Sequence, residues 1–161
     1  MDCKKILLIS DTHSNFKILE DVLSYNQNCE YLIHLGDDPN DLDYFTKLTE
    51  NMNIFYVYGL YHDKWKPENS VVKFSIHGQD FCISHAKEFL LKMKDNCIYC
   101  YGHTHKRDFY AHNKIVLINP GHLKNTIDRG EIASYVIINL KKKIEFNFFD
   151  INHQLIEVKM I

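Results

Sequence analysis

Three continuous apolar runs mark the first part of the chain, at 5–10, 31–35 and 54–58. Apolar runs without alternating polar positions are typical of strands that are covered on both faces. Between these runs, apolar residues recur at helical spacing within 16–23 and 39–48. Ser14 or Asn15 can cap the first of these helices. Strands that alternate with helices predict βαβ units in a mostly parallel sheet with right-handed crossovers.

The second part of the chain is richer in strands. Alternating apolar segments joined by short turns predict three hairpins, at 71–84, 108–119 and 132–149. A short helix at 88–93 leads to a buried strand at 97–101, the segment 120–130 reads as a polar loop, and the tail at 155–160 reads as an edge strand. The expected fold is a mixed α/β (α+β) arrangement of two packed mixed β-sheets flanked by helices, in a single domain over residues 1–161.

Composition and charge exclude several classes of protein. The chain has 161 residues, of which 45% are hydrophobic and 25% charged, as in an ordinary globular domain. Its net charge is −2, and no block of Lys and Arg forms a nucleic-acid footprint. No apolar run is long enough to span a membrane, so no membrane partner is expected. Ten tyrosines and ten phenylalanines leave room for a homodimer face.

The N-terminus and the cysteines bear on cellular location. The segment 1–10 has neither the long apolar core nor the cleavage site of a signal peptide, so we expect a cytoplasmic protein. In that compartment thiols are reduced, and we expect no disulfide among the five cysteines. Cys97 and Cys100 have the spacing of a metal knuckle, but no second pair completes one.

The segment Gly102-His103-Thr104-His105 follows the apolar run at 97–101. In an extended segment, residues two apart point to the same side, so His103 and His105 face one site. Ligands of open α/β sheets bind outside the carboxyl ends of the strands. Five of the expected strands end in Asp or His: Asp11 with His13, Asp37, His62, His85, and His103 with His105.

Carboxylates mixed with imidazoles are typical ligands of first-row divalent metals such as Mn, Fe, Ni, Co or Zn. There are more of them here than one ion needs, which favours two ions bridged by a carboxylate. Taken singly, a strand-end Asp is a common turn former and a buried His a common core residue. Their coincidence at five strand ends favours the metal site. We interpret four other histidines as structural: His34, His77, His112 and His153.

Several short motifs, in order, resemble the calcineurin-like metallophosphoesterases, especially their small single-domain phosphodiesterase branch. That family carries D-x-H, G-D, G-N-H-D/E, a His beside a Gly, and G-H-x-H. The corresponding segments here are Asp11-Thr12-His13, Gly36-Asp37, Gly59 with His62-Asp63, His85, and Gly102-His103-Thr104-His105. Asn119-Pro120-Gly121 also resembles a segment of the small branch.

The resemblance implies a dinuclear site and a phosphodiesterase. One divalent metal would take Asp11, His13 and His105, the other would take His85 and His103, and Asp37 would bridge them. Manganese is the metal we expect first, with Ni, Fe, Co or Zn as alternatives. A hydroxide bridging the metals would attack a small phosphate-ester substrate.

The resemblance also implies a catalytic role for the third motif. His62 would protonate or stabilise the leaving group, and Asp63 would orient its ring.

Two departures from the family pattern give weight to another hypothesis. Tyr61 falls on the position of a metal-binding Asn when His62 and Asp63 are aligned, and Ala86 replaces a Gly that many members carry beside the His. A relative of this fold is a non-catalytic scaffold of the retromer type. A catalytically weak or inactive interaction module is therefore the alternative to the enzyme, and a nuclease-like activity is the weaker third candidate.

Overall fold

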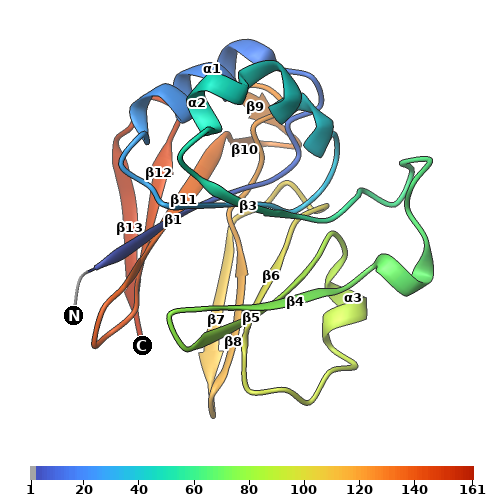
Figure 1. Cartoon of the computed structure of the whole chain (residues 1–161), viewed down its shortest axis with the longest axis vertical. Helices are drawn as coiled ribbons and strands as arrows, with labels where there is room; N and C mark the ends of the chain where they lie inside the picture. The colour runs from blue at the N-terminus through green and yellow to red at the C-terminus, as the bar shows by residue number, and fades with distance from the viewer. Residues whose placement is uncertain (1–2) are drawn as a thin grey trace.

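The computed structural model describes residues 3–161 as two β-sheets packed face to face, with helices above the first sheet (Figure 1). The two mixed sheets flanked by helices confirm the expected fold class. The first sheet has the order β13-β12-β11-β1-β2-β3. Its strands are β1 (Lys4–Ile9), β2 (Tyr31–His34), β3 (Asn53–Tyr56), β11 (Ser134–Leu140), β12 (Glu145–Asp150) and β13 (Leu155–Met160).

The βαβ units predicted from the apolar runs are present. β1, β2 and β3 are parallel neighbours, whereas β11, β12 and β13 extend the sheet in antiparallel fashion. Helix α1 (Phe16–Tyr25) connects β1 to β2, and the side chain of Asn15 caps it by accepting from Ile18 N–H. The single helix expected at 39–48 is instead a 3-10 helix, η1 (Pro39–Phe45), followed by one α-turn, α2 (Thr46–Thr49).

The second sheet has the order β4-β5-β6-β8-β7. Its strands are β4 (Val72–Ile76), β5 (Gln79–Ser84), β6 (Ile98–Tyr101), β7 (Asp108–His112) and β8 (Ile115–Asn119). β5, β6 and β8 are parallel, and both outer strands are antiparallel to their neighbours. A 3-10 turn, η2 (Pro67–Asn69), precedes β4, and helix α3 (Lys87–Leu90) connects β5 to β6.

Side-chain alternation along β1 explains the layering. Ile6 and Leu8 point between the two sheets, while Leu7 and Ile9 point toward α1. Burying both faces stabilises the strand by about 1.5–3 kcal/mol for each large apolar side chain. A third apolar cluster lies on the outer face of the second sheet, beneath α3. The layers therefore leave the carboxyl ends of the central strands at one rim of the molecule.

Two expectations about local structure are wrong. The loop at 120–130 was expected to lack strands. Its last residues instead belong to a small hairpin formed by β9 (Ile127–Asp128) and β10 (Glu131–Ile132). Cys82 and Cys97 were expected to be reduced, but they form a disulfide. Cys82 lies in β5 and Cys97 directly precedes the neighbouring β6, which brings their Cα atoms to 6.2 Å, within disulfide range. The 15-residue separation hides this proximity in the sequence.

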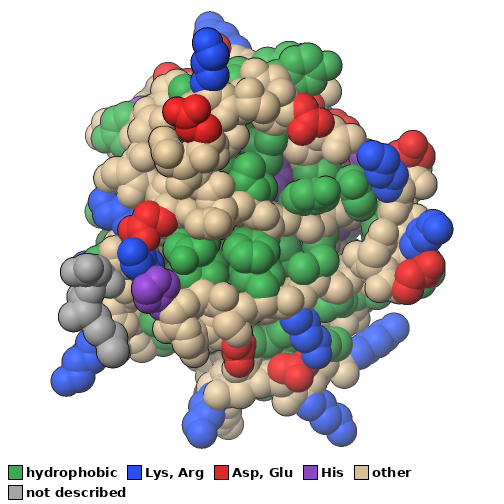
Figure 2. Space-filling view, in the orientation of Figure 1, with side chains coloured by type: hydrophobic (Ala, Val, Ile, Leu, Met, Phe, Trp, Pro, Cys, Tyr) green, Lys and Arg blue, Asp and Glu red, His purple; other side chains and the backbone are tan. Residues whose placement is uncertain are grey.

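The surface shows no dominant charge. Figure 2 shows acidic and basic side chains of both signs scattered over the face in view, with hydrophobic side chains exposed across its middle. This band follows β3 and β4, whose Phe55 and Phe74 rings stack at 3.7 Å between the two sheets. Within residues 3–161, no helix has the length and apolar character needed to cross a membrane.

Candidate metal centre

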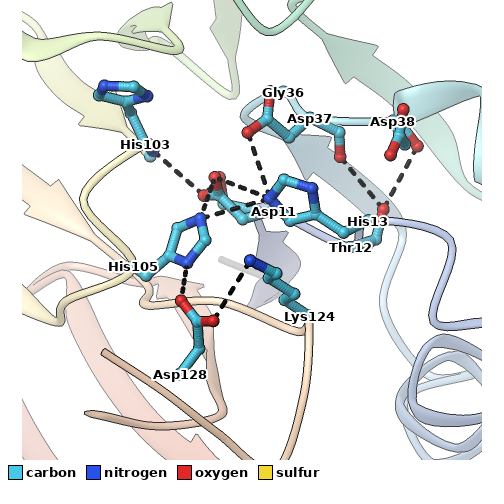
Figure 3. Close-up of polar contacts among 12 residues, drawn as sticks. Asp11, Thr12, His13, Gly36, Asp37, Asp38, His103, His105, Lys124 and Asp128 are labelled. Atoms are coloured by element: carbon cyan, nitrogen blue, oxygen red, sulfur yellow. Dashed lines mark hydrogen bonds and ion pairs between the residues drawn. The ribbon is translucent and has the colours of Figure 1, made fainter. Parts of the chain in front are cut away.

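The Asp and His residues expected at one site do converge, at the carboxyl ends of the central strands (Figure 3). Asp11 and His13 follow β1, Asp37 follows β2, His85 follows β5, and the two histidines at 103 and 105 follow β6. The parallel strands on either side of the interface end at the same rim, so side chains distant in sequence meet there. His62 and Asp63, in the loop after β3, are described separately below.

Four of these residues form a compact cluster: Asp11, His13, Asp37 and His105 offer ligand atoms within 4.8 Å of one another. His13 Nε2 lies 3.3 Å from His105 Nε2 and 3.3 Å from Asp37 Oδ2. His105 Nε2 lies 3.2 Å from Asp11 Oδ1. Two carboxylates and two imidazoles suit a first-row divalent metal.

Asp11 is the buried centre of this cluster. Its Oδ2 accepts from Ser10 Oγ at 2.5 Å and from the His103 N–H at 3.1 Å. Its Oδ1 is fully buried and has no hydrogen-bond partner, although His105 Nε2 is close. A buried, unpartnered carboxylate oxygen is costly unless a cation or proton neutralises it. The orientation of Asp11 therefore fits metal binding through Oδ1.

His105 is held by a carboxylate that the sequence did not reveal as part of the site. Asp128 Oδ2 lies 2.5 Å from His105 Nδ1, and Lys124 Nζ lies 3.3 Å from Asp128 Oδ1 (Figure 3). The contact with His105 lowers the pKa of Asp128 to about 2. A charged carboxylate favours the proton on Nδ1, which leaves Nε2 as a lone-pair donor toward the cluster.

The protonation of His105 follows from two opposing influences. Burial disfavours the charged ring, but the contacts with Asp11 and Asp128 outweigh burial and raise the pKa of His105. Without a metal, the ring of His105 therefore keeps its second proton to higher pH than a free imidazole, and this proton offsets the charge of the two carboxylates. A divalent cation would take its place.

A second, smaller group shares Asp37. His85 Nε2 lies 3.4 Å from Asp37 Oδ1 and 3.3 Å from His103 Nδ1. His85 Nδ1 lies 2.8 Å from the Leu35 carbonyl, to which it donates, so its Nε2 is also free to bind a metal. Burial would raise the pKa of Asp37, but contacts with His13 and His85 prevail and lower it far below its usual range. Asp37 is placed to serve both groups.

The backbone around the site is in a sparsely populated conformation. Five of the six expected metal ligands have positive φ: Asp11, His13, Asp37, His103 and His105, between 46° and 66°. Such angles cost about 1–3 kcal/mol each in non-glycine residues and cluster at functional sites. A Cβ on Gly59 would lie 1.8 Å from Asp37 Oδ1, and one on Gly102 would lie 2.0 Å from Ser10 Oγ. Both glycines are therefore required for the close approach of the chain to the carboxylates.

His62 and Asp63 contact each other but no metal ligand among the described residues. Asp63 Oδ1 and the Lys64 N–H approach His62 Nδ1, at 2.9 and 3.1 Å, while Asn40 Nδ2 lies 3.2 Å from Nε2. The two contacts at Nδ1 need opposite protonation of that nitrogen, so one is made at a time. Their catalytic role stays a prediction.

Tyr61 does not occupy the position of the missing Asn ligand. Its side chain is 92% exposed. Gly59, in contrast, lies against Asp37, and the residue that follows this glycine in the sequence is Leu60. Alignment on the glycine thus places Leu60, not Tyr61, where the family has its Asn. Neither side chain is a metal ligand.

Two further histidines lie near the site. His34 accepts from Gly36 N–H and contacts Thr12 Oγ1, and burial lowers its pKa to about 4. This neutral, hydrogen-bonded ring confirms the structural interpretation of His34. His122, which the sequence did not single out, is fully buried, and its ring centre is 5.3 Å from that of His105. Its position after Asn119-Pro120-Gly121 was the available signal.

Comparison with known proteins identifies the family. A model of the calcineurin-like phosphoesterase superfamily domain matches residues 5–143. The chain belongs to this superfamily. No curated protein sequence gives a significant match.

Several solved structures have a fold similar to that of nearly the whole chain. An uncharacterized protein of Streptococcus pneumoniae, described as a predicted phosphoesterase, aligns with a TM-score of 0.74 at 18% identity, over 100% of this chain and 98% of its own. The phosphoesterase Yfce of E. coli aligns with a TM-score of 0.74 at 18% identity, over 96% and 98%. Vacuolar Protein Sorting 29 of Cryptosporidium parvum aligns with a TM-score of 0.71 at 19% identity, over 99% and 97%. These likenesses establish the fold.

Proposed function

We propose that this superfamily member is a metal-dependent phosphoesterase, and more specifically a phosphodiesterase acting on a small phosphate ester. The observation that carries the proposal is the meeting of three acceptor atoms. Asp11 Oδ1, His105 Nε2 and His13 Nε2 approach one another, with 3.2 and 3.3 Å between neighbours. Acceptors brought this close need a cation or a proton between them, and a divalent metal can satisfy all three at once.

The proposal includes two divalent ions. Asp11, His13 and His105 would hold the first, His85 and His103 the second, and Asp37 would bridge both. Manganese is our first choice, with Ni, Fe, Co or Zn as alternatives that the ligand types also suit. When bound, such ions lower the pKa of water toward neutrality and offset negative charge on a phosphate.

The side chains around the ligands fix their orientation. Asp128 holds the proton of His105 on Nδ1, and the Leu35 carbonyl does the same for His85. Ser10 and the His103 N–H turn Asp11 so that Oδ1 faces the cluster. Preorganised donors and ligands of this kind avoid reorganisation during reaction.

His62 is our candidate for the proton donor to the leaving oxygen. A doubly protonated ring donates through Nδ1 to Asp63 and keeps the Nε2 proton for transfer. Loss of such a donor lowers turnover by about 10²–10⁴-fold.

The proposal is tested with a chromogenic phosphodiester and added Mn²⁺. We expect metal-dependent hydrolysis, and a loss of about 10³-fold or more in Asp37→Asn, because the bridging carboxylate serves both ions. Asp38→Asn is the matched control, since it neutralises the adjacent carboxylate, which contacts no metal ligand by its side chain among the described residues. Equal activity of wild type and Asp37→Asn across a broad ester panel would remove the enzyme proposal.

A non-catalytic interaction module is the second candidate. The absence of the third-motif Asn, with Tyr61 facing solvent, favours it. The likeness to Vacuolar Protein Sorting 29 concerns the fold. Metal content after purification with Mn²⁺ distinguishes the two: about two ions per chain supports the enzyme, and none supports the module.

A further inference from the structure

β13 is an outer strand that pairs only with β12 among the described residues (Figure 1). It is the longest outer strand of the two large sheets, with six residues against four in β3 and five each in β4 and β7. A long outer strand with exposed apolar side chains is a template for pairing with another chain. The exposed apolar residues of this segment are Leu155, Ile156, Val158, Met160 and Ile161.

The free edge of β13 follows from the direction of its backbone groups. Ile161 and Ile144 exchange both of their backbone hydrogen bonds, at 3.0 and 3.1 Å. In an antiparallel pair, such mutual bonds recur at every second residue, so Lys159 and Glu157 also bond toward β12. Val158 and Met160, which alternate with these residues, direct their N–H and C=O groups away from β12.

The charges of β13 select one way of pairing with a second copy. Glu157 and Lys159 lie on the same face, with Oε1 and Nζ 2.5 Å apart. In an antiparallel contact between two copies, the residues whose backbone groups point outward must lie opposite one another. A two-fold axis that meets this condition can pass by residue 157, 158 or 159. An axis at 157 places two glutamates opposite each other, and an axis at 159 places two lysines. Only the axis at Val158 places each Glu157 opposite Lys159 of the second copy.

We propose that β13 is a homodimer contact in which two copies pair antiparallel about Val158. The two six-stranded sheets would then continue through the contact. Opposite charges meet at both Glu157–Lys159 positions, whereas the neighbouring registers place like charges opposite and are disfavoured. Val158 meets its own copy, and Met160 meets Ile156, which covers side chains that are exposed in one chain. The β-bulge between Phe148 and Phe149 limits the contact at the other end of the strand.

Sedimentation velocity over a concentration series tests this contact on the full chain. We expect a dimer for wild type. Glu157→Lys and Lys159→Glu should each weaken it about tenfold or more, because each places two pairs of like charges opposite each other. The double variant Glu157→Lys/Lys159→Glu should restore the dimer, and an equimolar mixture of the two single variants should form a heterodimer.

A second pair of variants tests the backbone. Val158→Pro removes an N–H that faces away from β12, so the chain should fold and the dimer should be lost. Val158→Thr, which keeps this N–H, should remain dimeric. A monomeric wild type, a dimer that survives either charge reversal, or a double variant that stays monomeric would each refute the contact. Phosphoesterase activity is measured separately and does not enter this test.

Discussion

The two halves of the metal centre differ in how completely they are built. The half around Asp11 has four ligands in one cluster, and Asp128 and Lys124 support it from outside. The half around His85 has two imidazoles and a share of Asp37, and the expected amide ligand is missing. If two ions bind as proposed, we expect the first to bind more tightly than the second. On the proposed function, occupancy of the second half then distinguishes the enzyme from the interaction module.

Reduction of the Cys82–Cys97 disulfide should lower the free energy of unfolding, and this is the largest effect among these predictions. The disulfide lies next to the weaker half of the metal centre. Cys82 and Cys97 join β5 to the start of β6, the two strands that lead to His85 and His103. Closing a loop of about 15 residues stabilises a fold by about 3 kcal/mol. We therefore expect urea unfolding with a reductant to show a free energy of unfolding lower by about this amount.

The control for this experiment is the double variant Cys82→Ala/Cys97→Ala. Its free energy of unfolding should not change with reductant, because this variant lacks the Cys82–Cys97 disulfide. If wild type is insensitive to reductant, the two cysteines are unpaired in solution and our original expectation of reduced thiols stands.

Acidification should weaken metal binding at both halves. Burial disfavours the charged rings of His85 and His105, but neighbouring carboxylates raise the pKa of each above its usual value. Protons and metal compete for these nitrogens, so affinity falls as pH drops through the raised pKa values. One displaced proton corresponds to about tenfold per pH unit, or about a hundredfold over two units. Calorimetric Mn²⁺ titrations over a pH series measure this, and a flat profile would contradict it.

The same histidines affect the stability of the metal-free protein in a defined direction. Because the folded pKa of His105 lies above the unfolded value, its stabilising contribution is complete below the unfolded pKa and is lost as pH rises through the folded pKa. His34 has the opposite sign. Its folded pKa of about 4 lies below the unfolded value of 6.5, so its contribution is lost as pH falls between these values.

Loss of the outer carboxylate should weaken the stronger half alone. Asp128→Asn removes the charge that holds His105 in its metal-binding tautomer, and such changes lower metal affinity about 10–100-fold. We expect the first Mn²⁺ binding step to weaken while the second is unchanged. Asp63→Asn, which removes a carboxylate next to His62, is the matched control. An unchanged first step in Asp128→Asn would show that Asp128 is not needed to orient the ring.

The smallest expected effect is a gain at the weaker half. Gly59 adjoins Asp37, so Leu60→Asn would place an amide where the family has one, and the second Mn²⁺ should bind about tenfold more tightly. Tyr61→Asn should change little, because Tyr61 faces solvent. The reverse result would show that the loop aligns on His62 instead of Gly59. Competitive titration with a metal indicator measures both variants.

The sequence predicted the parts of the site that depend on local pattern. A buried strand is visible as an apolar run, and the first polar residues after it must lie at the sheet rim. Asp11, Asp37, His85 and His103 could therefore be assigned to one site before their distances were known. The same reasoning predicted the hairpins, which the structure confirms, and an α1 cap at Ser14 or Asn15, of which the structure selects Asn15.

Only the tertiary structure decided which side chains support those ligands. Asp128 ends the two-residue strand β9, 23 residues after His105, and no periodic pattern predicts where so short a hairpin folds back. The Cys82–Cys97 pairing and the exposure of Tyr61 likewise depend on how strands pack and loops turn. The sequence by itself determined which candidate ligands lie at the sheet rim, because strand ends follow from short-range burial. The tertiary structure determined their orientation and unequal support, because those depend on long-range contacts.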